Sequence, residues 1–286
     1  MAAVSIGVPV YNGAATLRAA LECLRVQTFT DIEVIVSDNG STDGSREIAA
    51  EFADRDSRFR LVHQPENIGA RNNFRALIDL ASSDLFMWRA DDDLSSENYV
   101  EVLKRLLDGH PDAYLAAPKS LLVAPDGTVH KVLPVEEPRA RWRPVHMGKT
   151  LLGASPNWIY GLWRREALRV AMDDTGAIYP YLWAWDPLTV LPAVLDEAVV
   201  GGNEAVLFKL ASPTPRYSSR VPASEMIAMR RVFRRACLAE FGKRKWGWSE
   251  RPVLFVYVLR FANLRVYRFF KMLRRYIREK LGIIRA

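Results

Sequence analysis

The sequence predicts an α/β protein built on a mostly parallel sheet flanked by helices. Over the first third of the chain, short apolar runs rich in β-branched residues alternate with amphipathic stretches, a pattern typical of βαβ units. Polar clusters follow three of the predicted strands. Open α/β sheets bind ligands at the carboxyl ends of their strands, so these clusters predict a binding site.

The elements of the first third are short and well separated. Leu17, Leu21 and Leu24 recur on one face of the first predicted helix, as an amphipathic helix requires. The predicted strands are Val4–Val10, Glu33–Ser37, Phe59–His63 and Leu85–Arg89, and the predicted helices are Ala14–Gln27, Asp43–Phe52 and Ala70–Ala81.

Regularity weakens after about residue 112. Pro125-Asp126-Gly127 predicts a hairpin turn, residues 134–145 and 212–220 read as loops, and Trp158–Trp163 and Val199–Leu210 as strands. A helix is expected from Arg165, and further helices in the rest. We therefore divide the sequence at residues 1–112, 113–220 and 221–286, the last part a basic helical tail.

The composition points to a globular protein of a reducing compartment. The chain has 286 residues, 49% of them hydrophobic, and only two cysteines, Cys23 and Cys237. Their wide separation argues against a disulfide scaffold or a zinc site. The first residues read as a strand and not as a signal peptide, and no apolar run reaches the length of a membrane span. A cytoplasmic location is expected.

The charge is unevenly distributed. Residues 221–286 hold 17 Lys and Arg against 4 Asp and Glu, whereas the rest of the chain is net acidic. Apolar residues recur in this tail at three- and four-residue steps, at Leu259, Ala262, Val266, Phe270, Leu273, Ile277 and Leu281. A basic amphipathic helix fits an anionic membrane surface; a helix packed on the domain with a solvated basic face is the alternative. No nucleic-acid-binding module is recognisable, which disfavours nucleic acid.

Three adjacent carboxylates follow the fourth predicted strand, at Asp91, Asp92 and Asp93. Adjacent like charges repel, and a hard divalent cation such as Mg²⁺ or Mn²⁺ would relieve that repulsion. Such a metal would also neutralise a diphosphate leaving group. A solvated acidic turn before a helix capped by Ser95 or Ser96 is the alternative.

Other polar residues at the predicted edge have weaker individual signals. Asp38 could accept a hydrogen bond from a base or a ribose, Tyr11 could stack on a base, and Arg71 could meet phosphate or a base. Turn chemistry, packing and an ordinary surface position are the respective alternatives. His63 and His146 read as packing or surface residues.

Together these segments resemble the family-two inverting glycosyltransferases, which have the GT-A fold. The resemblance is carried by Val4-Ser-Ile-Gly-Val-Pro-Val-Tyr-Asn-Gly13, Gln27 to Ser45, Asn67-Ile-Gly-Ala-Arg-Asn72 and Ala90-Asp-Asp-Asp93. It covers residues 4 to about 105, and it continues faintly through Tyr160 to Leu168 as far as about residue 196. Residues 1–112 would then be the nucleotide-sugar-binding half and residues 113–220 the acceptor-binding half of one domain.

The resemblance implies roles for the donor-site residues. Pro9 and Tyr11 would line the base pocket and Asp38 would bind the base, with Arg71 beside the nucleotide. The three aspartates stand where the family has its Asp-any-Asp metal motif. Asp92 is then the predicted metal ligand, and Asp91 or Asp93 would meet ribose or metal. The sequence departs from the family at Arg89-Ala90, where an acid is common, so the register of the aspartates is open by one position.

The resemblance also implies a catalytic base and acceptor contacts. Inversion needs a general base for the acceptor hydroxyl, and Asp186 occupies the corresponding place. Trp183 and Trp185 could form a platform for a sugar ring. Arg216 and Tyr217 lie where the family has a segment that closes over the diphosphate. The alternative for Asp186 is a cap on a helix beginning at Pro187.

The implied residue roles together predict one reaction. The expected reaction moves a sugar from a nucleoside diphosphate sugar, with UDP favoured, to an acceptor hydroxyl, in surface polysaccharide or glycolipid assembly. A glycan or a lipid-linked sugar would be the acceptor, at the inner face of the plasma membrane. Two other classes remain open: a sugar-phosphate nucleotidyltransferase, although a basic glycine-rich phosphate loop is missing, and a non-catalytic nucleotide- or glycan-binding module.

Overall fold

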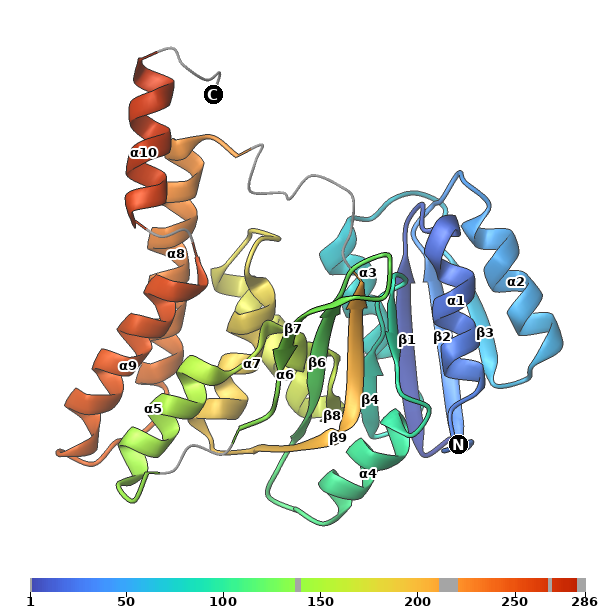
Figure 1. The fold of residues 1–286 in the computed structure, drawn as a ribbon, viewed down its shortest axis with the longest axis horizontal. Helices are drawn as coiled ribbons and strands as arrows, with labels where there is room; N and C mark the ends of the chain where they lie inside the picture. Colours follow the sequence, from blue (N-terminus) through green and yellow to red (C-terminus); the bar gives the residue numbers. More distant parts are fainter. Residues whose placement is uncertain (1, 137–139, 211–220, 267–268, 282–286) are drawn as a thin grey trace. The chain divides into compact units, whose positions relative to one another are not determined.

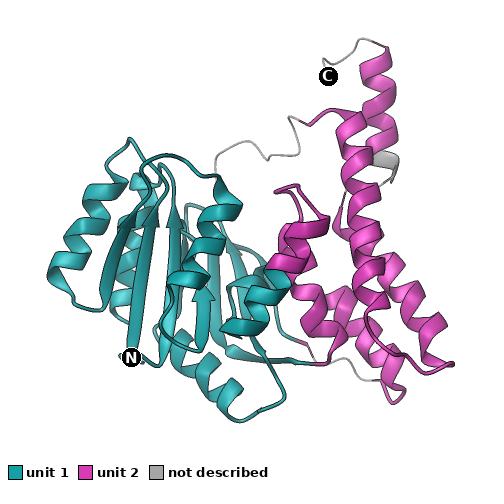
Figure 2. Cartoon of the chain, turned by 180° about the vertical axis from the view of Figure 1, so that it is seen from behind, with its two compact units in different colours: residues 1–135, 157–172, 198–212 teal, residues 136–156, 173–197, 213–286 magenta. Residues whose placement is uncertain are grey.

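The computed structural model describes residues 2–136, 140–210, 221–266 and 269–281 (Figure 1). The chain forms two compact units (Figure 2). Unit 1 comprises residues 1–135, 157–172 and 198–212, and unit 2 comprises residues 136–156, 173–197 and 213–286. The basic C-terminal helices share unit 2 with two earlier segments of the chain.

Unit 1 is a mixed sheet with strand order β3-β2-β1-β4-β8-β6-β9-β5, and β7 pairs with β6. The pairs among β1, β2, β3 and β4 are all parallel, as is β6 with β9, while β8, β7 and β5 pair antiparallel. The sequence prediction of an α/β sheet flanked by helices is confirmed. The strands are β1 Val4–Val10, β2 Ile32–Asp38, β3 Phe59–His63, β4 Leu85–Trp88, β5 Asp93–Ser95, β6 Leu115–Val123, β7 Val129–Leu133, β8 Leu162–Arg164 and β9 Val199–Leu210.

Helices cover both faces of the parallel part of this sheet. Ile6 and Val8 of β1 belong to one buried cluster with Leu17 of α1. Gly7, between them, faces Leu77 of α3. Successive strand residues point to opposite faces, so α1 and α3 lie on opposite sides of β1. The helices of unit 1 are α1 Ala14–Arg25, α2 Ser45–Arg55, α3 Ala70–Leu80, α4 Tyr99–Asp108 and the first part of α6 Arg165–Ile178.

Unit 2 is helical and has its own core. Tyr179 packs edge-on against Phe233 of α8, and Phe233 in turn packs against Phe261 of α9. Arg143 at the start of α5 pairs with Glu197 and Glu250. The helices are α5 Arg143–Gly153, the end of α6, α7 Trp185–Leu195, α8 Ala223–Gly242, α9 Glu250–Arg265 and α10 Phe269–Lys280, and a 3₁₀ helix, η1 Pro156–Tyr160, spans the boundary between units.

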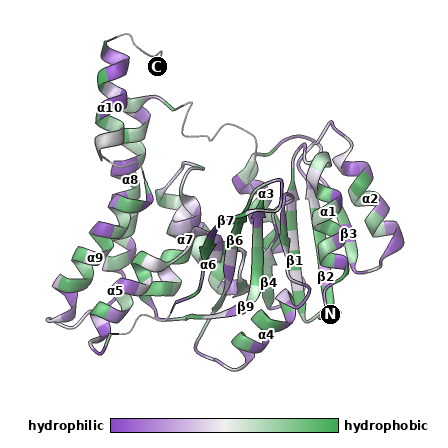
Figure 3. Cartoon of the chain, in the orientation of Figure 1, coloured by the Kyte–Doolittle hydropathy of each residue, from purple (hydrophilic) through white to green (hydrophobic). Residues whose placement is uncertain are grey.

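The packing of the C-terminal helices differs from the single apolar face that the sequence spacing suggests. Ala262 and Val266 are buried, whereas Leu273, Ile277 and Leu281 are exposed. Along α10 hydrophobic and hydrophilic residues alternate in Figure 3. None of the described helices is long and apolar enough to cross a membrane.

Candidate functional site

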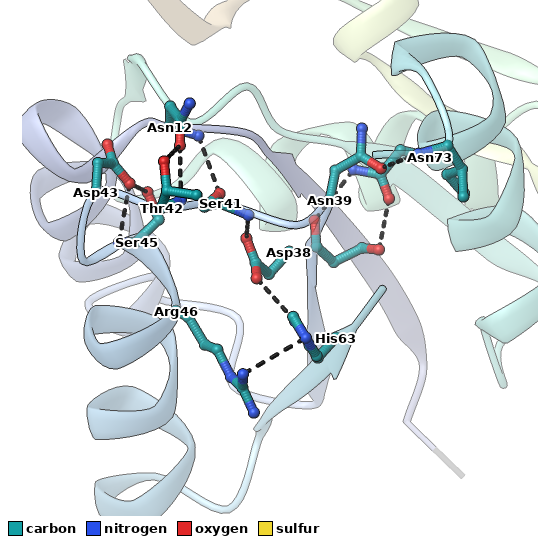
Figure 4. Close-up of polar contacts among 12 residues, drawn as sticks. Asn12, Asp38, Asn39, Ser41, Thr42, Asp43, Ser45, Arg46, His63 and Asn73 are labelled. Carbon is teal, nitrogen blue, oxygen red and sulfur yellow. Dashed lines mark hydrogen bonds and ion pairs between the residues drawn. The ribbon is translucent and has the colours of Figure 1, made fainter. Parts of the chain in front are cut away.

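The carboxyl edge of β1 and β2 carries two loops that are tied together by hydrogen bonds (Figure 4). The backbone N–H of Asn12 donates to Ser41 Oγ at 2.9 Å, and the Thr42 N–H donates to Asn12 Oδ1 at 2.9 Å. Asn12 has a φ of 53°, a left-handed conformation that asparagine tolerates better than most residues. The loop after β1 is therefore held in one shape by the loop after β2.

The start of α1 belongs to the same network. The Gly13 N–H donates to Ser45 Oγ, and the Ala14 N–H donates to Asp43 Oδ2. Ser45 Oγ donates to Asp43 Oδ1 at 2.6 Å. These acceptors satisfy backbone donors that a helix N-terminus leaves open. Asp43 and Ser45 are thus structural, and they join α1 to α2.

Tyr11 and Pro9 have different surroundings. Tyr11 is 50% exposed in the loop after β1. Pro9 is buried inside β1, where it is in register with Ser37 of β2. Their predicted contacts with a base remain predictions, and only Tyr11 offers an exposed surface for one.

Asp38 ends β2 and is fully buried, at 0% exposure. Its Oδ1 accepts the Ser41 N–H at 3.1 Å, and its Oδ2 lies 2.9 Å from His63 Nδ1. Both oxygens of the carboxylate are therefore engaged by the protein. The predicted contact between Asp38 and a base remains a prediction, and this geometry favours an indirect role for Asp38 in holding the loop.

The acidic run lies beside the Tyr11 loop. The Asp91 carboxylate lies so close to the Gly13 α carbon that a Cβ at position 13 would overlap it. Asp91 and Asp92 are partly buried. Burial raises the pKa of Asp91 to about 6, and the neighbouring charge of Asp92 adds to this effect. Two of the predicted donor-site segments thus meet at one place in unit 1.

Asp93 has a different environment from its two neighbours. It is fully buried on β5, in register with Lys209 of β9, and its Oδ2 forms an ion pair with Lys209 Nζ at 2.6 Å. Burial opposes the charged form of Lys209, but the surrounding charges, including those of Asp93 and Asp92, raise its pKa. The carboxylate of Asp93 already holds a cation, so its predicted metal role has a competing structural explanation.

Arg89 is a buried cationic residue at a place where the family often has an acid. Arg89 has 0% exposure, donates to the Leu94 carbonyl and lies 4.6 Å from the centre of the Tyr99 ring.

The carboxylates of the acidic run are suitable ligands for a divalent metal. Asp91 and Asp92 supply hard carboxylate oxygens, and Asp93 Oδ1 is buried without a hydrogen-bond partner. Among the described residues, no three acidic, His or Cys side chains form a ready-made cluster. Two carboxylates with substrate phosphates still suit Mg²⁺ or Mn²⁺.

Arg71 lies in the first turn of α3 and is partly buried. The segment before this helix is fixed to the β2 loop, because the Ile68 N–H donates to Asn39 Oδ1 and Asn39 Nδ2 donates to Asn67 Oδ1. Buried Asn73 of α3 accepts the Ser37 hydroxyl at 2.6 Å. The helix that carries Arg71 is therefore anchored to the end of β2.

Asp186 and the tryptophans lie in unit 2. Asp186 is in the first turn of α7, which begins at Trp185 with Ala184 as its N-cap. Asp186 is therefore not the cap of a helix beginning at Pro187, which was the alternative from sequence. Trp185 is buried at 9% exposure, and its carbonyl accepts the Thr189 hydroxyl. Trp183 is partly buried, whereas Arg216 and Tyr217 lie outside the described residues.

The sequence indicates only a packing or surface position for His63, and the structure places its ring against Asp38. Its side chain retains 34% exposure, contacts Asp38, and lies with Nε2 at 3.5 Å from Arg46 Nη1. The register of β3 with β2 pairs His63 directly with Asp38. A signal existed, because a polar residue ending each of two neighbouring parallel strands predicts a contact at the sheet edge.

Part of the chain is similar in sequence to known proteins. Residues 5–145 match the family model described as "Glycosyl transferase family 2". A putative glycosyltransferase, EpsH of Bacillus subtilis, is 37% identical over 111 residues, 38% of this chain and 32% of the relative. The glycosyltransferase GlyG of Streptococcus pneumoniae is 36% identical over 100 residues, 35% and 33% of the two chains. The match therefore spans about a third of these relatives.

Two solved structures have a similar fold. S. aureus TarS, solved with UDP-GlcNAc, superposes with a TM-score of 0.64 at 17% identity, over 88% of this chain and 71% of TarS. The mannosyltransferase PcManGT of Pyrobaculum calidifontis, solved with GDP-Man and Mn²⁺, gives a TM-score of 0.58 at 15% identity, over 99% and 81%. At this identity the superpositions establish a shared GT-A fold.

Proposed function

Because the chain belongs to glycosyl transferase family 2, we propose that it transfers a sugar from a nucleoside diphosphate sugar, UDP favoured, to an acceptor hydroxyl with inversion. The observation that carries this proposal is the contact between the acidic run and the β1 loop, where Asp91 abuts Gly13. This contact brings carboxylates and an exposed tyrosine to the carboxyl edge of a parallel sheet, where such folds bind ligands.

Each side chain of the proposed donor site has a separate chemical role. Tyr11, with its ring half exposed, would stack on the base. Asp92 and Asp91 would hold Mn²⁺ or Mg²⁺, which when bound supplies charge neutralisation for the departing diphosphate. Arg71 would lie beside the nucleotide. The ion pair with Lys209 supports a revised role for Asp93, fixing β5 and hence the position of Asp92.

The acceptor half of the proposal rests on Asp186. A general base must take the acceptor proton as the new glycosidic bond forms, and the first turn of α7 presents Asp186. Trp183 would contact the acceptor sugar. Trp185 is buried at the start of α7 and would instead pack inside unit 2. Arg216 and Tyr217 are proposed as contacts to the diphosphate.

We further propose that the acceptor is a glycan or a lipid-linked sugar of surface polysaccharide or glycolipid assembly, and that the protein works at the inner face of the plasma membrane. The excess of basic residues in residues 221–286 supports an anionic surface as partner.

The exposed face of α10 supports the same partner. Buried Met272 and the Arg275–Glu279 ion pair share one side of the helix, and Glu279 accepts the Ala223 N–H at the start of α8. The opposite side is an apolar stripe, 41–67% exposed, formed by Leu273, Tyr276, Ile277 and Leu281. Exposed Arg274 and Arg278 border it. Apolar residues flanked by arginine fit the lipid headgroup region.

The donor site is tested by nucleotide binding. We expect one nucleoside diphosphate to raise the melting temperature of the wild type in the presence of Mn²⁺, because ligand binding stabilises the native state. Asp92→Asn should lose this shift, whereas Asp112→Asn, at an exposed position of the same unit, should keep it. If UDP, GDP, dTDP and CDP all leave the wild type unchanged with Mn²⁺ present, the proposed function is wrong.

The base is tested by turnover. Asp186→Asn should keep the nucleotide shift but reduce transfer about 10²–10⁴-fold, the usual contribution of a general base. A release assay for the nucleoside diphosphate with a panel of sugar donors and acceptors measures this. Transfer at the wild-type rate in Asp186→Asn would remove Asp186 from the mechanism while leaving the donor site intact.

A further inference from the structure

We propose that His63 is a positioning residue of the nucleotide site, acting through Asp38 and Ser41 on the loop that presents Tyr11. The proposal rests on the proposed function in one respect, that a nucleotide binds at this edge. Figure 4 shows the contacts that lead to this loop, from Arg46 of α2, His63 at the end of β3 and Asp38 at the end of β2.

The hydrogen-bond geometry fixes the tautomer of His63. Asp38, when ionised, can only accept hydrogen bonds, so the Nδ1 atom that lies 2.9 Å from its Oδ2 must carry the hydrogen. Arg46 can only donate, so the Nε2 atom that lies 3.5 Å from its Nη1 must accept. Both contacts therefore favour the arrangement with a hydrogen on Nδ1.

The buried carboxylate needs this donor. Asp38 has no exposed surface, and water therefore cannot replace a lost partner without rearrangement. The Ser41 N–H and the His63 ring are the donors that satisfy Oδ1 and Oδ2. A buried charge that loses a hydrogen-bond donor is strongly destabilised, so the carboxylate would turn away from its present position if His63 were removed.

Movement of Asp38 would reach the binding loop. Asp38 accepts from the N–H of Ser41, and the Ser41 hydroxyl accepts from the N–H of Asn12. Asn12 directly follows Tyr11, the exposed aromatic residue of the site. The chain of contacts thus runs from Arg46 through His63, Asp38, Ser41 and Asn12 to the loop that presents the Tyr11 ring.

Two isosteric substitutions separate this role from simple packing. An Asn amide nitrogen can occupy the place of His Nδ1, whereas a Gln amide nitrogen reaches toward the place of Nε2. We expect His63→Gln to weaken binding of the nucleoside diphosphate by about tenfold, since small displacements of positioning groups have effects of this size. His63→Asn should restore most of the affinity. Titration calorimetry with Mn²⁺ present measures both.

A kinetic and a spectroscopic readout complete the test. His63→Gln should raise KM for the donor more than it lowers kcat, because His63 touches no reacting group. In ¹⁵N-labelled wild type the His63 ring should show the Nδ1–H tautomer, which the contact with Asp38 favours, and Arg46→Met should shift the Nε2 resonance, because Nε2 loses its neighbouring donor. Arg55→Met, on the same helix but paired with Glu51, is the matched control and should not change the His63 signal.

The outcomes separate this inference from the proposed function. If the wild type binds no nucleotide, the proposed function fails first. If the wild type binds and His63→Gln binds equally well, or if Asn rescues no better than Gln, the positioning role is wrong. Should His63→Gln fail to fold, the exposed Arg46→Met variant decides: an unchanged His63 Nε2 resonance and an unchanged nucleotide affinity in that variant overturn the relay.

Discussion

The edge of unit 1 and the helices of unit 2 each contain a glycine pressed against a side chain, and the two contacts serve different ends. Gly13 lies against the Asp91 carboxylate, whereas Gly148 of α5 lies against the Tyr257 ring of α9. The first contact brings a charged group to a loop at the sheet edge. The second only lets two helices approach. The two contacts therefore differ in what meets the glycine, a carboxylate at the sheet edge and an aromatic ring between the helices.

The two regions also differ in how they satisfy polar groups. At the sheet edge, the backbone N–H groups of Asn12, Gly13 and Ala14 are each accepted by a side chain from the β2–α2 loop or from the start of α2. In unit 2, Arg244 pairs with Asp196 and Glu240, and exposed apolar groups remain along α10. The first arrangement fixes the loop that is proposed to bind the nucleotide. The second leaves a surface, consistent with the proposed membrane contact.

Gly13→Ala is the substitution expected to break the sheet edge most severely. The added Cβ would overlap the Asp91 carboxylate and would lie 3.0 Å from Val10 Cγ2. Overpacking of this kind costs about 1–3 kcal/mol, and it should also abolish the metal-dependent nucleotide shift. Gly153→Ala, where nothing lies within 4 Å of the added carbon, is the control. Chemical denaturation of both variants measures the difference, and equal stability would show that Asp91 yields without cost.

The apolar stripe of α10 is expected to contribute to membrane binding by unit 2. Leu273→Ser with Ile277→Ser should weaken binding to vesicles containing anionic phospholipid about tenfold, because apolar area would no longer enter the headgroup region. Neutral vesicles should bind the wild type less tightly, since the flanking arginines add electrostatic attraction.

Val129→Ser with Val132→Ser, two half-exposed positions in unit 1, is the matched control for the stripe. Sedimentation with vesicles measures binding, and light scattering measures the mass of the protein in solution. Unchanged vesicle binding of the α10 variant would overturn the membrane role of α10. A wild-type dimer that the α10 variant converts to monomer would show that a second copy covers the stripe.

The sequence anticipated the sheet edge better than the helices for a physical reason. Short apolar strands followed by polar loops bring Tyr11, Asp38 and Asp91 to one edge wherever the strands are parallel neighbours. Helical periodicity gives only an apolar face, not what covers it. Ala262 and Leu273 are both apolar and belong to the same series of three- and four-residue steps, yet Ala262 is buried and Leu273 is exposed. Side-chain pairs across strands, such as Asp93 with Lys209, depend on the register between β5 and β9. The apolar pattern of the sequence does not predict that register.

Asp91→Asn should have the smallest effect, and in an unusual direction. Because burial raises the pKa of Asp91 to about 6, the folded protein holds this proton more tightly than the unfolded chain does. The favourable contribution is complete at low pH and is lost as pH rises through about 6. Without metal, Asp91→Asn should therefore stabilise the protein by about 1–2 kcal/mol at pH 8 and by little at low pH. Urea denaturation across this range measures it. A destabilised variant at pH 8 would mean that the ionised Asp91 carboxylate already has a compensating partner in the protein. Asp91 would then stabilise the sheet edge without a metal.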